Sequence, residues 1–97
     1  NPMQPAALRQ IRQVVAAGRK QGKTVAVCGE MAGDPVLAPL LVGLGVDELS
    51  MAPTAIPTVR AALEKFSLQQ LSELAEQVCQ ASTVEEVAKL CAGLQQR

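Results

Sequence analysis

Residues 24–51 constrain the fold more than any other part of the chain. Residues 24–28 are rich in β-branched side chains and apolar on both faces, which is typical of a parallel strand covered on both sides. A glycine-containing loop follows, and Asp34 is predicted to cap a helix over residues 35–44. Residues 46–51 form a second strand candidate. A strand, a helix and a strand in this order predict a right-handed βαβ unit.

Helical spacing of apolar residues marks most of the remaining sequence. Residues 5–20 are predicted to form a helix that stops before Gly22. A further helix is predicted over residues 56–65. Ser67 is expected to cap a fourth helix and Ser82 a fifth, where the sequence STVE has the form of a capping box.

Two parallel strands cannot make a stable sheet by themselves, because both of their edges stay unpaired. The sequence therefore predicts a mostly helical α/β chain that is the last part of a larger sheet or barrel. A helical interaction or dimerisation module without catalytic function is the alternative. Both interpretations predict that the isolated chain associates in size-exclusion chromatography.

Composition excludes several classes of function. Nine basic residues balance nine acidic ones, so no net charge attracts nucleic acid. The longest apolar stretch, residues 36–46, is interrupted by proline and glycine and is too short to cross a membrane. No signal peptide is visible, and three cysteines without paired spacing favour a cytoplasmic setting over a disulfide framework. The absence of histidine removes the commonest metal ligand and general base.

Cys28 is the residue with the strongest chemical potential. It ends the first predicted strand and is followed by Gly29 and Glu30, at the edge where β/α barrels carry their active sites. The helix start after Asp34 is expected to offer free N–H groups to an anion. Without histidine, proton transfer to a basic carbon such as an enolate is the chemistry left to this thiol. Spacing alone favours a small buried hydrophobe at Cys28, and Glu30 can equally be a solvated loop acid.

The other candidate residues are assigned structural roles. Cys79 and Cys91 lie on predicted helices with no polar cluster nearby, which indicates buried positions. The arginines on predicted helices are interpreted as parts of solvated faces; they are Arg9, Arg12, Arg19 and Arg60.

Residues 27–35, VCGEMAGDP, closely resemble the catalytic cysteine motif of enzyme I of the phosphoenolpyruvate-dependent sugar phosphotransferase system. Residues 44–51, LGVDELSM, followed by Ile56 and Pro57, look like the last barrel strand and helix of that family. The segment Asn1-Pro2-Met3 is a third match. Pyruvate phosphate dikinase and phosphoenolpyruvate synthase share the cysteine motif. The LSM stretch and the short tail after residue 65 favour enzyme I.

The resemblance implies that residues 1–97 are a C-terminal fragment of a phosphoenolpyruvate-binding domain, about the last two β/α units of a (β/α)8 TIM barrel with added C-terminal helices. The family transfers phosphoryl from phosphoenolpyruvate to a protein histidine and on to HPr or a paralogous carrier, releasing pyruvate. Cys28 would protonate the enolpyruvate carbon, with Gly29 and Glu30 in the same motif. The family also uses Mg²⁺ and forms a homodimer.

Several parts that the family needs are missing from these residues. The chain has no histidine to phosphorylate. By the resemblance, the arginines that bind the substrate and the acidic ligands of magnesium lie upstream, so no metal site is expected in residues 1–97. The isolated chain is therefore expected to be inactive.

Overall fold

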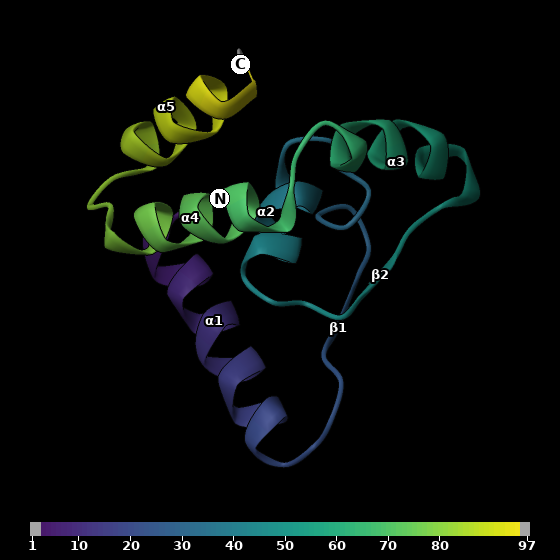
Figure 1. Ribbon diagram of the computed structural model, residues 1–97, viewed down its shortest axis with the longest axis horizontal. Coiled ribbons are helices and arrows are strands. Elements are labelled where there is room, and N and C mark those ends of the chain that lie inside the picture. Colours follow the sequence, from purple (N-terminus) through teal and green to yellow (C-terminus); the bar gives the residue numbers. More distant parts are fainter. Residues whose placement is uncertain (1–2, 96–97) are drawn as a thin grey trace.

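The computed structural model describes residues 3–95, and Asn1 and Pro2 of the N-terminal match lie outside that range. Helices dominate the described chain, and two short strands lie between them (Figure 1). The elements in order are α1 (Pro5–Lys20), β1 (Ala26–Cys28), α2 (Leu37–Gly43), β2 (Glu48–Ser50), the 3₁₀ turn η1 (Pro53–Ala55), α3 (Ile56–Glu64), α4 (Leu68–Gln80) and α5 (Val84–Gln95). The predicted mostly helical α/β class is confirmed.

The two strands are parallel neighbours connected through α2, which confirms the predicted strand–helix–strand order. Both are shorter than expected, at three residues each. Asp47 explains why both strands begin later than predicted. The Val25 N–H donates to its Oδ2 at 2.8 Å, and the Asp47 N–H donates to the Val25 carbonyl at 2.9 Å. Just before the sheet begins, the Asp47 carboxylate therefore accepts the N–H that a backbone carbonyl of the neighbouring strand would otherwise accept.

Within residues 3–95 only one face of this sheet is covered, whereas the sequence predicts cover on both faces within a larger sheet or barrel. Val27 and Leu49 pack against the core, whereas the residues on either side of each are exposed. The open face carries small and polar side chains, namely Ala26, Cys28, Glu48 and Ser50.

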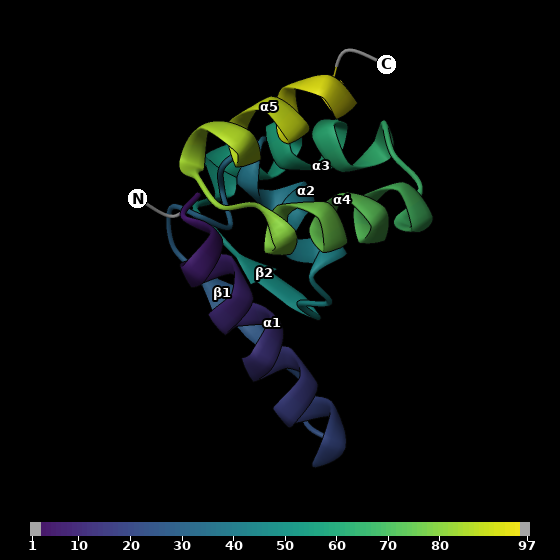
Figure 2. The same ribbon diagram turned by 90° about the vertical axis from the view of Figure 1, so that its left-hand side faces the viewer.

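The core lies in the helical layer, with α4 at its centre. Helix α4 contacts α1, α2 and α5, and α5 lies on the far side of α4 from the two strands (Figures 1 and 2). The largest fully buried side chains come from α1, α2, α4 and α5; they are Leu8, Leu40, Leu41, Val78 and Val87. Burying such aliphatic side chains is worth about 1.5–3 kcal/mol each. Helix packing, rather than the short strands, therefore holds this fold together.

Helix α2 begins at Leu37, two residues later than predicted. The Asp34 carboxylate still caps its first turn, because Oδ1 accepts from the N–H groups of Val36 and Leu37 at 2.7 and 3.0 Å. Because α2 begins at Leu37, Pro39 lies in the first turn of this helix. A missing N–H costs little there, so no bend is needed.

Glycines in the left-handed region end α1 and α2. Gly22 has a φ of 68°, and Gly45 has a φ of 100°. After α2, the Gly45 N–H donates to the Val42 carbonyl and the Val46 N–H to the Leu41 carbonyl, which together form a Schellman motif. The predicted stop before Gly22 is confirmed, and the equivalent stop at Gly45 aims the chain into β2.

The predicted cap of α4 is confirmed, whereas the cap of α5 was placed one residue too early. Ser67 accepts from the Gln70 N–H at 3.1 Å, and the Gln70 side chain accepts from the Ser67 N–H in return. At α5, Thr83 rather than Ser82 accepts the helix N–H, which belongs to Glu86. The STVE pattern misplaced the cap because two hydroxyl residues stand side by side.

Replacing Ser67 by alanine is expected to lower the free energy of unfolding by about 1 kcal/mol, since the N-terminus of α4 loses the acceptor in its capping box. Urea denaturation of the chain measures this change. Ser72 is exposed within α4 and serves as the matched position. Ser72→Ala should cost nothing, because alanine favours helix. Equal losses from both substitutions would show that the cap contributes no stability of its own.

Candidate functional site

Cys28 is the last residue of β1, and its thiol is exposed. It pairs in register with Ser50, the last residue of β2. The next backbone bond, from the Gly29 N–H to the Ser50 carbonyl at 3.1 Å, closes the ladder. The structure thus places Cys28 at the carboxyl end of a parallel strand, as predicted. Its exposure removes the alternative that it is a buried hydrophobe within this chain.

The backbone turns sharply after Cys28, at Gly29, whose φ is 92°. A side chain at this position would be strained, which explains why the motif needs glycine there. Glu30 follows, and it is exposed. Gly29 and Glu30 help to line a hollow of about 470 Å³ between the loops after β1 and β2, completed by Gly33, Asp34, Pro35, Met51, Ala52 and Ala55.

Cys28 does not line this hollow, so the structure separates the motif into two parts. The thiol belongs to the open face of the sheet, whereas Glu30 lies at the strand ends. Gly33 brings the two loops together, because a Cβ placed there would lie 3.4 Å from that of Ala55 and 3.5 Å from that of Met51. The glycines of the motif therefore shape the strand ends, and the thiol stands beside them.

The expected anion site at the start of α2 is wrong. The N–H groups of Val36 and Leu37 are already taken by the Asp34 carboxylate, and the Ala38 N–H donates to the Asp34 carbonyl at 2.8 Å. The sequence correctly identified Asp34 as the acceptor at this helix start, although the N-cap position itself belongs to Val36. A cap that satisfies these donors leaves none of them for a substrate phosphate.

Three of the four arginines make structural contacts instead of merely covering solvated faces. Arg9 donates to the carbonyls of Cys79 and Ala81, at the C-terminus of α4, at 3.1 and 3.4 Å. Arg12 pairs with Glu76, and Arg19 donates to the Gly45 carbonyl at 3.2 Å. Arg60 borders a separate groove beside β2 and α3. None of these arginines lines the hollow at the strand ends.

Cys79 and Cys91 are buried, as predicted. Burial raises the pKa of the Cys79 thiol, and it likewise raises the pKa of the Cys91 thiol. Less thiolate is therefore present at neutral pH. Cys28 is thus the one accessible thiol of the three.

The described residues do not provide a site for the magnesium ion that the resemblance implies. Between residues 3 and 95, no three histidine, cysteine, aspartate or glutamate side chains gather closely enough to bind a metal ion. Glu30 and Asp34 are the two carboxylates at the hollow. The Asp34 carboxylate is engaged with its own helix, so the donor set does not fit.

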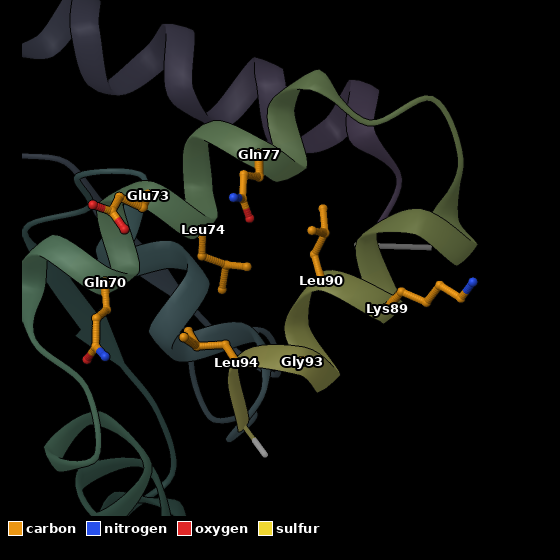
Figure 3. Close-up of a pocket in the computed structure, with 8 residues that line it drawn as sticks. All are labelled: Gln70, Glu73, Leu74, Gln77, Lys89, Leu90, Gly93 and Leu94. Carbon is orange, nitrogen blue, oxygen red and sulfur yellow. The ribbon is translucent and has the colours of Figure 1, made fainter. Parts of the chain in front are cut away.

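Another hollow, of about 270 Å³, lies between α4 and α5, far along the chain from the cysteine motif (Figure 3). Leu74, Leu90 and Leu94 point into it. Two of its polar side chains already have partners in α4, since Gln70 belongs to the capping box and Glu73 accepts from Gln69. It contains none of the residues that the sequence singled out.

The candidate site has three features, namely the ends of two parallel strands, a turn at Gly29 and an exposed thiol at Cys28. Residues 1–68 match the family described as PEP-utilising enzyme, PEP-binding domain. The chain belongs to this family of phosphoenolpyruvate-utilising enzymes. The resemblance noted in the cysteine motif is thereby confirmed at the level of the family.

The curated relatives specify the class further. The chain is 50% identical to a multiphosphoryl transfer protein of Xanthomonas campestris pv. campestris over 88 residues, which are 91% of this chain and 10% of that protein. It is 46% identical to the phosphoenolpyruvate-protein phosphotransferase of Bacillus subtilis over 86 residues, which are 89% of this chain and 15% of that protein. The corresponding enzyme of Staphylococcus epidermidis is 45% identical over 92% of this chain and 16% of its own length.

The chain thus spans from a tenth to about a sixth of the length of these relatives. Within residues 3–95, no helix combines the length and the apolar character that crossing a membrane requires.

Proposed function

We propose that residues 1–97 are the C-terminal part of the phosphoenolpyruvate-binding (β/α)8 barrel of a phosphoenolpyruvate-protein phosphotransferase, and that Cys28 is its proton donor. The observation that carries the proposal is the exposed thiol at the carboxyl end of a parallel strand, within the family's cysteine motif. Barrel enzymes place their reacting groups at this edge of the sheet.

In the proposed reaction, the phosphoryl group leaves phosphoenolpyruvate for a histidine outside these residues, and the enolate of pyruvate remains. The S–H bond of Cys28 then breaks as a C–H bond forms on the methylene carbon. The electron pair of the S–H bond stays on sulfur, and pyruvate leaves. In the reverse direction, the thiolate takes a proton from the methyl group of pyruvate. A thiol can do both because it is a weaker acid than a carboxylic acid and a stronger acid than the methyl C–H of pyruvate.

The open surfaces of the chain support its place in a larger barrel. β2 has no second strand neighbour in the described chain. Next to β2 and α3 lies a groove of about 460 Å³ with mostly apolar lining, which includes Val46, Leu49, Val59 and Leu63. Ile56 at its border is 42% exposed. A further β/α unit packed here would pair the edge of β2, fill the groove and cover the exposed Ile56.

The complete enzyme would supply the remaining parts. The phosphorylated histidine, the substrate-binding arginines and the magnesium ligands would lie in other segments. HPr or a paralogous protein would accept the phosphoryl group, and the barrel domain would form a homodimer in the cytoplasm. Within this proposal, residues 1–97 contribute the thiol and the strand ends that hold it.

The direct test is to incubate the full-length polypeptide that contains residues 1–97 with ³²P-phosphoenolpyruvate and magnesium. Label should appear on the protein and then on added HPr, with release of one pyruvate per phosphoryl group and without ATP. Pyruvate phosphate dikinase and phosphoenolpyruvate synthase also use a nucleotide. Dependence of the phosphoryl transfer on adenine nucleotide, or no transfer to any carrier protein, would overturn the assignment.

A further inference from the structure

The face of the sheet that carries Cys28 also carries a hydroxyl group at the neighbouring position. The register pairs Cys28 with Ser50, and both residues are exposed. The pair before them, Val27 and Leu49, packs against the core. Because side chains alternate along a strand, Cys28 and Ser50 point to the same open face. Neighbouring strands lie about 4.8 Å apart, so a change of rotamer can bring the hydroxyl to the sulfur.

The backbone holds this pair in place while leaving the hydroxyl free. The Gly29 N–H donates to the Ser50 carbonyl at 3.1 Å, which fixes the register at the last residue of each strand. Within residues 3–95, no hydrogen bond engages the Ser50 hydroxyl, and none joins it to Cys28. A neutral thiol is a weak acceptor, whereas a thiolate accepts a charge-assisted bond. The hydroxyl is therefore available when charge appears on the sulfur.

Two acidic residues lie in the segments next to the thiol, one in β2 and one in the loop after β1. Glu48 lies on the same face, roughly 6.6 Å along β2 from Ser50. Glu30 is in the loop that follows β1. Both carboxylates oppose a negative charge on sulfur. No other element of the described chain covers this face, so Ser50 is the neutral donor adjacent to Cys28.

We infer that Ser50 is a positioning residue for Cys28, whose hydroxyl donates a hydrogen bond to the thiolate left after proton delivery; this inference rests on the proposed function. Cys28 loses its proton to the enolate carbon and keeps the electron pair, and the Ser50 hydroxyl keeps its own proton. The bond strengthens as charge develops on sulfur. Ser50 therefore stabilises the transition state for proton transfer more than the resting thiol.

The first test measures Cys28 alone. In the full-length polypeptide, the rate of alkylation of Cys28 by iodoacetamide is followed against pH by mass spectrometry of its peptide, since the thiolate is the reactive form. Ser50→Ala should slow alkylation about 10-fold at neutral pH and leave it unchanged at alkaline pH, where every thiol is ionised. Ser50→Thr, which retains a hydroxyl, should restore the wild-type profile. An unchanged profile in Ser50→Ala would overturn the inference.

The second test separates this inference from the proposed function. Ser50→Ala should lower kcat for pyruvate formation about 10-fold with little change in KM, and Ser50→Thr should rescue it. If Cys28→Ala leaves turnover intact, the proposed proton-donor role of Cys28 is wrong, while the alkylation profile still judges the contact with Ser50. If Cys28→Ala abolishes turnover and Ser50→Ala alters neither turnover nor alkylation, only the role of Ser50 is wrong.

Discussion

Replacing Cys28 by alanine in the full-length polypeptide is expected to slow conversion of phosphoenolpyruvate to pyruvate by roughly 10²–10⁴-fold, the usual contribution of a positioned acid. The side chain is exposed at the end of β1, so its removal leaves no cavity in the core. The loss should therefore appear in turnover and not in stability. A steady-state assay of pyruvate release, together with urea denaturation of the same variant, measures both quantities.

Cys91 provides the matched control because the same substitution there removes a buried thiol. Cys91→Ala should lower the free energy of unfolding by about 1 kcal/mol, as expected for loss of a small buried group, and leave turnover near the wild-type value. Cys28→Ala is thus expected to lower turnover but not stability, and Cys91→Ala to lower stability but not turnover. If Cys28→Ala lost stability and retained its rate, Cys28 would be a structural residue.

Replacing Gly43 by alanine is expected to cost about 3 kcal/mol or more in the free energy of unfolding, because α2 and α4 touch at this glycine. A Cβ at Gly43 would overlap the carbonyl oxygen of Leu71 and lie 2.7 Å from its carbonyl carbon. These are backbone atoms within α4, so no side-chain rotation relieves the clash. Urea denaturation at a protein concentration where the oligomeric state is constant measures the loss.

Gly93 in α5 is the control for this change. A Cβ there meets no atom of residues 3–95 within 4 Å. Gly93→Ala should therefore stabilise the chain by about 0.5–1 kcal/mol through helix propensity. Replacing glycine by alanine is thus expected to lower the free energy of unfolding at Gly43 and to raise it at Gly93. If Gly43→Ala were also neutral or stabilising, the close approach of α2 and α4 would be contradicted.

The helices could be predicted from the sequence because each carries its own signal. Periodic apolar residues mark α1 and α4, Gly22 ends α1, and Ser67 starts α4. These features are local, so the structure differs from the prediction by only a residue or two at most ends. Thr83 replaced Ser82 as the cap of α5 because adjacent hydroxyl residues compete for the same position.

The candidate site was predictable only in part. The position of Cys28 follows from the strand pattern, and the family follows from its motif. The pairing of Cys28 with Ser50 does not, because register depends on contacts between segments 22 residues apart. The contact of Arg9 with the carbonyls at the end of α4 was equally invisible, because it joins segments about 70 residues apart. A pattern in one sequence can indicate which residue has a role, but it does not show which distant residues that side chain contacts.

The most direct test of the central claim follows the proton itself. The full-length polypeptide is incubated in D₂O with phosphoenolpyruvate, pyruvate and magnesium, and NMR records deuterium in the vinyl positions of phosphoenolpyruvate, which requires removal of a methyl proton from pyruvate. Cys91→Ala should incorporate deuterium at the wild-type rate, whereas Cys28→Ala should incorporate it at least about 10²-fold more slowly. Incorporation by a folded Cys28→Ala variant at the wild-type rate would contradict the assignment of Cys28 as the proton donor.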